Sequence, residues 1–412
     1  MCIRDRLLIL IIINVGPLYG RMQSAIDQVN RCIQENLTAI RVVKSYVRGD
    51  YEVEKFGVVN ENLKSESEKA FGTAVLNMPA MQFVMYGTIL GILLIGGRLI
   101  NEGQMMIGQL TSFLSYVLLI LNSLMMMSNV FLLMTRSLAS AERIMEVIDE
   151  KIDITDENAK DIAVAKGEIE FDHMWFKYKD TAKEYVLSDV SFHIKPGQTV
   201  GIIGQTGSSK TTLVQLIPRL YDVTKGEVKI DGINVKEYPV RHLRDAVAMV
   251  LQKNTLFSGS LIDNLRWGNE NATLDEIKEA CQIACVDEFV DRLADGYDTE
   301  MGQEGVNVSG GQKQRICIAR AILKKPKVLI LDDSTSAVDT ATEAKIRSGL
   351  AEKLPDMTKI IIAQRISSVR HADQIIIMDR GHVEAIGTHE SLLRDNQIYQ
   401  EIYASQKEGA DL

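Results

Sequence analysis

The sequence predicts an all-α, membrane-spanning part followed by an α/β part, and three observations carry this prediction. Residues 71–97 and 103–135 contain no Asp, Glu, Lys or Arg, and each stretch exceeds the roughly 20 apolar residues that cross a bilayer. From Gly167 onward, short runs rich in Val, Ile and Leu alternate with helical segments, which is typical of a buried parallel sheet. A glycine-containing loop, GQTGSSKT (residues 204–211), separates one such run from a helix.

The composition limits the classes of protein to which this chain can belong. Its 412 residues are enough for two or three domains. Hydrophobic residues make up 46% of the chain and charged residues 25%, a mixture that fits a membrane part joined to a soluble part. The formal net charge of -9 argues against nucleic acid as a partner, because binding to phosphates needs clustered Lys and Arg.

The cysteines are scattered and form no CxxC pair. Cys281 and Cys285 are four residues apart in a helical pattern, a spacing that a metal ion could use. We favour buried or free thiols in a reducing compartment. The complete set is Cys2, Cys32, Cys281, Cys285 and Cys317.

The membrane-spanning part is expected to comprise residues 1–150. The chain opens with MCIRDR directly before the apolar residues 7–15, so we expect that earlier helices are missing and that residues 7–20 are the tail of a third span. Residues 21–69 are charged and predict a helical pair, which its Lys and Arg place on the cytoplasmic side. The link at residues 101–103 then lies outside the cell, and the chain from Arg136 onward lies in the cytoplasm.

The second part is expected to comprise residues 167–412, after a polar linker at residues 151–166. Five apolar runs predict strands of a buried parallel sheet, since such strands are covered on both faces. These runs are residues 169–171, 199–203, 328–331, 360–363 and 375–378.

The segment VGIIGQTGSSKTTL (residues 200–213) is close to a P-loop, in which backbone N–H groups and a helix N-terminus bind phosphates. Lys210 would add a positive charge, and the Thr211 hydroxyl would hold Mg²⁺. Ser209 stands where the strict pattern has glycine, which accepts backbone conformations that Ser tolerates less well. The expected ATP-binding residues in this segment are Gly204, Gln205, Thr206, Gly207, Ser208, Ser209, Lys210, Thr211 and Thr212.

Two further motifs accompany this loop. The apolar run VLILD ends in Asp332, a carboxylate suited to organising Mg²⁺ at the carboxyl edge of a sheet. The segment VSGGQKQR (residues 308–315) then resembles the signature of the ABC ATPase family. In that family the helix N-terminus at the signature faces the γ-phosphate held by the other nucleotide-binding domain. The signature residues are Ser309, Gly310, Gly311 and Gln312.

Other landmarks of the family follow by resemblance. Tyr178 matches the aromatic residue that stacks on adenine, and Gln252 matches the loop glutamine that touches Mg²⁺. Ser336 to Asp339 match the loop that crosses the dimer interface, and residues 299–305 resemble the cross-linking loop of exporters. Residues 37–46 and 139–149 resemble the second half of an exporter membrane domain, with a coupling turn around residues 42–50.

The resemblance covers the whole chain. It implies a partial transmembrane helical domain of about three membrane helices, followed by an α/β P-loop NTPase domain of ABC type with a helical signature subdomain. It also implies ATP and Mg²⁺ as cofactors, with Thr211, Gln252 and Asp332 as the magnesium ligands. The expected partners are membrane lipid, a transported substrate and a second half-transporter. Exporters of drugs, lipids and peptides share these motifs, so the sequence leaves the substrate open.

Three positions depart from the family pattern. Asp333 replaces the Glu that polarises the attacking water, Gln364 replaces the switch histidine, and Ser209 replaces a glycine. A carboxylate displaced by about 1 Å can lower the rate on the order of 10²-fold, and Gln cannot become a cation. The expected catalytic set is Asp332, Asp333 and Gln364. The departures at Asp333 and Gln364 predict a weakly hydrolytic site in a heterodimer. Open alternatives are a working homodimer, a non-hydrolysing regulatory subunit and a soluble ABC ATPase of repair or translation.

Overall fold

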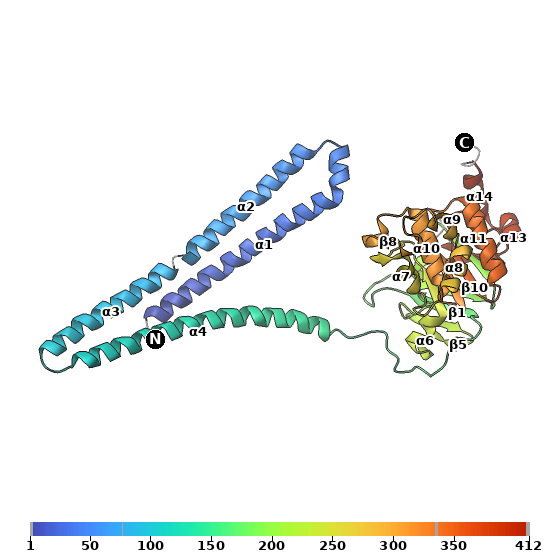
Figure 1. Ribbon diagram of the computed structural model, residues 1–412. Coiled ribbons are helices and arrows are strands. Elements are labelled where there is room, and N and C mark those ends of the chain that lie inside the picture. The colour runs from blue at the N-terminus through green and yellow to red at the C-terminus, as the bar shows by residue number, and fades with distance from the viewer. Residues whose placement is uncertain (1–2, 76, 334–336, 409–412) are drawn as a thin grey trace. The chain divides into compact units, whose positions relative to one another are not determined.

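The computed structural model describes residues 3–75, 77–333 and 337–408. The chain divides into two compact units, Met1–Glu150 and Lys151–Leu412. The first unit is helical throughout its regular structure, and the second combines sheets with helices (Figure 1).

The first unit consists of long helices. Residues 7–20 and the charged residues after them form one continuous helix, and residues 46–48 turn the chain into the next helix. The predicted span at residues 71–97 begins in the last turns of α2, which is described to Val75, and continues in α3 from Asn77. The helices are α1 (Ile3–Ser45), α2 (Gly49–Val75), α3 (Asn77–Asn101) and α4 (Ile107–Ile148).

Helices α1 and α2 form an antiparallel hairpin and lie side by side (Figure 1). Small side chains, Ala25 and Cys32 on α1 and Ala70 on α2, are buried. Ala25 and Cys32 are seven residues apart and therefore share one helix face. The Asn36 amide on α1 also donates to the Glu52 carboxylate on α2, with 2.9 Å between Nδ2 and Oε2. These contacts join the predicted helical pair.

Helices α3 and α4 carry the apolar stretches. Among the described residues, Gln82–Asn101 are long and apolar enough to cross a membrane, and Ile107–Ile120 form a shorter apolar segment. Large apolar side chains such as Phe83 and Leu94 are exposed within the isolated chain, as lipid-facing residues would be. Because α4 runs on to Ile148, the second predicted span continues without a break into a charged helical end.

Two sheets form the framework of the second unit. An antiparallel sheet has the order β2-β1-β4-β5, and a six-stranded sheet has the order β12-β11-β3-β10-β9-β6. In the six-stranded sheet, β11, β3, β10, β9 and β6 are parallel and β12 is antiparallel to β11. The strands are β1 (Ile169–Phe176), β2 (Leu187–Ile194), β3 (Thr199–Gly204), β4 (Lys225–Ile230), β5 (Ile233–Asn234), β6 (Val247–Val250), β7 (Gly259–Ser260), β8 (Glu300–Met301), β9 (Val328–Asp332), β10 (Thr358–Ile362), β11 (Gln374–Asp379) and β12 (His382–Gly387).

The strands of the parallel sheet are covered on both faces. On β9, Val328 and Ile330 pack into the core toward the antiparallel sheet, whereas Leu329 and Leu331 pack into the core beneath the helices. Successive side chains of a strand point to opposite faces, so burial on both faces requires a continuous apolar run. Four of the five predicted runs lie wholly within strands, and the fifth, residues 360–363, extends one residue past the end of β10. The expectation of parallel pairing was wrong for residues 169–171, because β1 pairs antiparallel with β2 and β4.

Helices connect the strands and leave the carboxyl edge of the parallel sheet open to the loops that follow β3, β6, β9 and β10. Since carboxyl ends of parallel strands meet at one edge, these loops converge there. The helices are α5 (Lys210–Gln215), α6 (Val240–Ala246), α7 (Leu261–Arg266), α8 (Leu274–Ile283), α9 (Asp287–Val290), α10 (Gly310–Leu323), α11 (Thr340–Lys353), α12 (Ile366–Val369), α13 (His389–Asp395) and α14 (Gln397–Glu408), with short 3₁₀ turns at Val235–Glu237, Gly296–Asp298 and Gln303–Gly305.

Candidate functional site

The loop between β3 and α5 has a backbone that few side chains tolerate. Gly207 has φ +87°, and Ser209 has φ 68° directly before α5. A Cβ atom at Gly204 would lie 2.2 Å from the Met378 carbonyl oxygen on β11, so this position accepts only glycine. The left-handed conformation at Ser209 is the one for which the P-loop pattern has glycine.

Lys210 folds back over this loop. Its ammonium donates to the carbonyl oxygens of Gly204 at 2.8 Å and Gln205 at 2.9 Å, and to the Ser208 hydroxyl at 3.2 Å. Burial lowers the pKa of Lys210 from its ordinary value, and Asp332 and Asp333 oppose this shift. The exposed loop residues are Gln205, Thr206 and Gly207, and Ser208 is buried. The loop therefore surrounds one cationic group.

Asp332, the last residue of β9, lies beside Thr211 on α5, with 3.1 Å between Thr211 Oγ1 and Asp332 Oδ1. The second carboxylate oxygen, Oδ2, is buried and has no hydrogen-bond partner among the described residues. Burial raises the pKa of this carboxyl, and the neighbouring Asp333 raises it further. A buried, unpartnered carboxylate oxygen next to a hydroxyl fits a hard cation such as Mg²⁺, which takes oxygen ligands.

Asp333 follows with a left-handed backbone, φ 47°, which Asp tolerates better than most residues. Two glutamine amides converge on its Oδ2 atom, Gln364 Nε2 at 2.7 Å and Gln252 Nε2 at 3.5 Å. Gln252 follows β6 and Gln364 follows β10, so the strand order brings three loops to one carboxylate. Burial raises the pKa of Asp333, and the hydrogen bond from Gln364 opposes that shift.

Tyr178 lies against the start of α5. Its hydroxyl is 2.9 Å from Thr212 Oγ1, while its ring is half-exposed. The ring of Tyr221 meets it edge-on, with 5.1 Å between centroids. An exposed aromatic face beside a phosphate-binding loop is suited to stacking on a base. Tyr221 lies in no recognisable sequence motif, so only the tertiary structure reveals its place beside Tyr178.

The signature residues lie at the N-terminus of α10. Ser309 caps this helix: its hydroxyl accepts from Gln312 N at 3.3 Å, and its own N–H donates to Gln312 Oε1 at 2.8 Å. A Cβ atom at Gly311 would lie 2.7 Å from the Ala337 carbonyl oxygen, whereas one at Gly310 would meet only the Ala337 Cβ at 3.6 Å. Only the second glycine is thus required by packing within the chain.

Asp339 caps α11, accepting a hydrogen bond from Thr342 N at 2.9 Å. Backbone and side-chain hydrogen bonds with Thr342 lower the pKa of Asp339. Ser336, named with this loop, lies outside the described residues. The structure therefore brings together the P-loop segment, Tyr178, Gln252, Asp332, Asp333 and Gln364, while the signature and Asp339 are built into their own helix N-termini.

Cys281 and Cys285 are both buried. Burial raises the pKa of the Cys281 thiol to about 12 and also raises that of Cys285. A metal ion binds thiolate rather than thiol, so these shifts disfavour a metal site at the pair. Among the described residues, no group of three or more His, Cys, Asp or Glu side chains could hold a metal ion.

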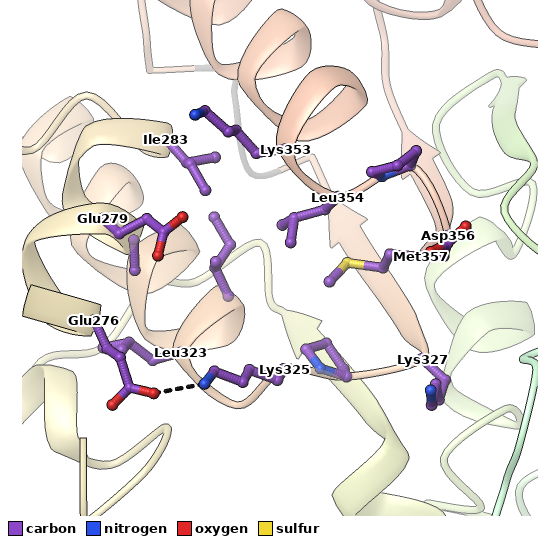
Figure 2. A pocket seen from close by; sticks show the side chains of 14 residues that line it. Glu276, Glu279, Ile283, Leu323, Lys325, Lys327, Lys353, Leu354, Asp356 and Met357 are labelled. Carbon is purple, nitrogen blue, oxygen red and sulfur yellow. Dashed lines mark hydrogen bonds and ion pairs between the residues drawn. The ribbon is translucent and has the colours of Figure 1, made fainter. Parts of the chain in front are cut away.

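A cavity of about 340 Å³ lies at the opposite edge of the sheet (Figure 2). Its walls come from α8 and from the segments that precede β9 and β10, and two of its lining residues, Glu276 and Lys325, form an ion pair. None of the predicted site residues lines it. The cavity is therefore distinct from the carboxyl edge where the loops converge.

Two family models match the chain. Residues 187–336 match a family described as ABC transporter. Residues 10–124 match the family described as ABC transporter transmembrane region. The first match contains the P-loop segment, the signature and both aspartates at the end of β9.

Individual proteins are similar over nearly the whole chain. YfiB of Bacillus subtilis (strain 168), an uncharacterized ABC transporter ATP-binding protein, is 41% identical over 398 residues, which are 96% of this chain and 69% of the relative. YgaD of the same organism, a putative multidrug export ATP-binding/permease protein, is 36% identical over 407 residues, again 96% and 69%. The solved structure of a bacterial Atm1-family ABC exporter with ATP bound has a TM-score of 0.87 and 28% identity, over 96% of this chain and 70% of that chain.

Proposed function

Because the chain belongs to the ABC transporter family, as an exporter-type half-transporter, we propose that it is one subunit of a heterodimer whose own Walker site binds MgATP but hydrolyses it slowly. The predicted fold class, a helical transmembrane domain followed by an ABC-type ATPase domain, is confirmed. The protein is membrane-embedded and its ATPase domain is cytoplasmic. The transmembrane match counts against the soluble ABC ATPase alternative.

In this proposal the P-loop segment and Tyr178 bind ATP. Lys210 and the N–H groups at the start of α5 hold the phosphates, and the Tyr178 ring stacks on adenine. Thr211, Asp332 and Gln252 hold Mg²⁺, which supplies charge neutralisation at the phosphates when it is bound. The buried, unpartnered Oδ2 of Asp332 is the observation that supports the ion.

The hydrogen bond from Gln364 to Asp333 is the observation that carries the slow-hydrolysis proposal. The Asp333 side chain is one methylene shorter than the Glu of the family, and Gln364 holds one of its oxygens at 2.7 Å. Burial raises the pKa of Asp333, which favours rather than opposes a role as a base. The proposed defect is therefore the position of the Asp333 carboxylate rather than its basicity, since a small displacement of a catalytic group lowers the rate steeply.

Gln364 contributes a second defect. Its amide cannot become a cation, so it cannot offer the positive charge that histidine offers at the γ-phosphate. Its Nε2 donor is also engaged by Asp333. Both residues of the hydrolytic pair are therefore expected to support hydrolysis less well than the Glu and His of the family pattern.

The signature half of the chain supports a site that two subunits share, and the intact signature beside altered Walker residues favours two different subunits. Ser309 and Gly310 are exposed at the N-terminus of the 14-residue helix α10, where the helix dipole favours an anion. This signature would complete the site that contains the partner's P-loop. The productive site then combines the partner's Walker residues with this chain's signature.

The test is chain-specific trapping of hydrolysed nucleotide in the purified full-length complex, with vanadate and photoactivatable 8-azido-ATP. We expect this chain to bind the nucleotide on ice but to trap little ADP at working temperature. The double substitution Asp333→Glu/Gln364→His should raise trapping on this chain by roughly tenfold or more, because it restores both groups. The matched control is Gln364→Asn, which keeps an amide.

Each outcome assigns the chain differently. Rapid trapping on the unmodified chain, lost in Asp333→Asn, contradicts the proposal and favours a homodimer with a working site. Trapping on neither subunit favours the non-hydrolysing regulatory alternative.

A further inference from the structure

The side chain of Gln406, near the end of α14, holds the loop that carries Gln364. Its Nε2 atom donates to the Gln364 carbonyl oxygen at 2.7 Å, and its Oε1 atom accepts from the Ile366 N–H at 2.9 Å. Both bonds are within normal hydrogen-bond length. One amide therefore bridges two main-chain groups of the loop between β10 and α12.

The N–H of Ile366 needs such a partner. Ile366 is the first residue of α12, and the N-cap residue Arg365 provides no side-chain hydrogen bond. The first N–H groups of a helix have no acceptor within the helix. Ile366 is also buried, so its N–H needs a partner from another part of the protein. Gln406 thus performs from another helix the task of a cap.

Helix α14 is itself fixed in place. Tyr399 is fully buried, and its hydroxyl is 2.7 Å from His389 Nδ1. The Tyr399 N–H also donates to Asn396 Oδ1 at 2.8 Å. Gln406 lies seven residues after Tyr399 and therefore on the same face of the helix. The Gln406 amide therefore belongs to a packed helix, α14, which limits how far this side chain can move.

The contacts continue to the carboxylate. Gln406 holds the main chain of Gln364, and the Gln364 side chain donates to Asp333 Oδ2 at 2.7 Å. A shift of the loop at residues 364–366 would move the Gln364 amide and release Asp333. Because both of these Gln406 hydrogen bonds are to main-chain atoms, they do not depend on which side chain stands at position 364.

We propose that Gln406 is a positioning residue for ATP hydrolysis, which places the switch residue at position 364 through its bridge to the Gln364 and Ile366 main chain. This inference rests on the proposed function of the Walker site. It assigns to the C-terminal helix a direct influence on the hydrolytic groups, with no contact between Gln406 and the nucleotide.

The experiment measures the rate of vanadate-dependent ADP trapping on this chain across a range of MgATP concentrations, in the full-length complex. Gln406→Leu, which removes both hydrogen bonds at similar volume, is made in the unmodified chain and in Asp333→Glu/Gln364→His. We expect the maximal rate to fall by on the order of tenfold or more, with the half-saturating ATP concentration unchanged, since a group that acts only on the reaction leaves binding intact. Gln406→Glu keeps the acceptor for the Ile366 N–H, so its maximal rate should lie between that of Gln406→Leu and that of the parent chain.

The matched control is Gln400→Leu in the same helix. Gln400 Nε2 donates to the carbonyl oxygens of Leu393 at 2.9 Å and Arg394 at 3.1 Å, so its loss tests the general stability of α14. We expect the maximal rate to be unchanged in this variant. An equal effect of Gln400→Leu and Gln406→Leu, no effect of Gln406→Leu, or no trapping in either parent overturns the inference. If the double substitution fails to raise trapping, the proposed function fails, while the ratio of Gln406→Leu to its parent still tests the bridge.

Discussion

The side-chain amide of Gln364 donates a hydrogen bond to the carboxylate of Asp333, with 2.7 Å between Nε2 and Oδ2. These are the two positions at which the chain departs from the hydrolytic pair of its family, and the structure makes them partners. The shorter carboxylate of Asp333 therefore accepts a hydrogen bond from the uncharged amide of Gln364. A change at either position alone leaves the other without this contact, so the two substitutions should act together rather than independently.

The first prediction compares the two halves of the chain in one reconstituted complex. Gly310→Asp should nearly abolish ATP hydrolysis and transport, because it places negative charge at a helix N-terminus that should face the γ-phosphate, where loss of one stabilising donor can lower the rate roughly 10²–10³-fold. Asp333→Asn should change total turnover far less. Both rates are measured as phosphate release from the same preparation.

Gly310→Ala is the control for the first prediction, because a Cβ atom at Gly310 would make only an ordinary contact with Ala337 at 3.6 Å. It should retain more activity than Gly310→Asp. If Asp333→Asn is as damaging as Gly310→Asp, the assignment of a weak site to this chain is wrong and a symmetric homodimer explains the protein better.

The second prediction concerns backbone strain at Ser209. Its φ of 68° costs a residue with a Cβ atom roughly 1–2 kcal/mol, so Ser209→Gly should raise the free energy of unfolding by about 1 kcal/mol. In a thermal unfolding scan of the full-length protein, the Tm of the ATPase unit should rise by about 3 °C. Ser209→Ala keeps the Cβ atom and is the control. Equal Tm values for the two variants would show that strain at this position is not relieved by glycine.

The third prediction concerns pH. Burial raises the pKa of Asp332 above its ordinary value, so the folded state favours the protonated form. The ionised carboxylate is therefore destabilising at neutral pH, and the penalty disappears as the pH falls through the raised pKa toward the ordinary one. Asp332→Asn should raise the Tm without nucleotide at neutral pH, with a difference that shrinks on acidification. It should also reduce the rise in Tm that MgATP causes in the unmodified protein.

Asp172 provides a control of opposite sign for the pH prediction. A hydrogen bond from Lys229 lowers the pKa of Asp172, so its ionised form is stabilising above the ordinary pKa and this stability is lost as the pH falls through the lowered value. Asp172→Asn should therefore lower the Tm at neutral pH. A Tm for Asp332→Asn that falls at neutral pH would contradict the account of Asp332 as a destabilising buried charge.

The fourth prediction concerns membrane topology. Asn101 ends α3 and is exposed, and the preceding residues are apolar enough to cross the membrane. In intact cells, Asn101→Cys should react with a membrane-impermeant maleimide, and Ser65→Cys on α2 should not. The described native cysteines, Cys32, Cys281, Cys285 and Cys317, are buried, which favours a low background. Labelling of Ser65→Cys with protection of Asn101→Cys would reverse the topology.

Local sequence patterns predicted the buried strands that carry the site, although not the short edge strands of the ATPase domain. Val328 to Leu331 alternate between two cores, and this double burial is visible as a continuous apolar run. The helix start at the signature was expected from the family resemblance, and in the structure Ser309 and Gln312 cap that helix reciprocally. The pairing of β1 could not be predicted in the same way, because a short apolar run does not encode the direction of its neighbour.

The long helices show a different limit. Absence of charge marked the apolar stretches but not their ends, and α1 and α4 each join an apolar part to a charged part without interruption. Backbone hydrogen bonds within a helix do not distinguish a lipid-facing residue from a solvated one. Absence of charge therefore located the apolar stretches and left the helix boundaries undetermined.

The sequence by itself determined the family, the order of the two parts, and the residue types available for phosphate, magnesium and base, because each depends on local spacing along the chain. Only the tertiary structure decided which of these groups meet. The strand order β3-β10-β9-β6 places Gln364 and Gln252 beside Asp333, and the packing of α14 places Gln406 against residues 364 and 366. Gln406 is 42 residues from Gln364, and a contact at that separation depends on how whole elements pack, which no local pattern of side chains specifies.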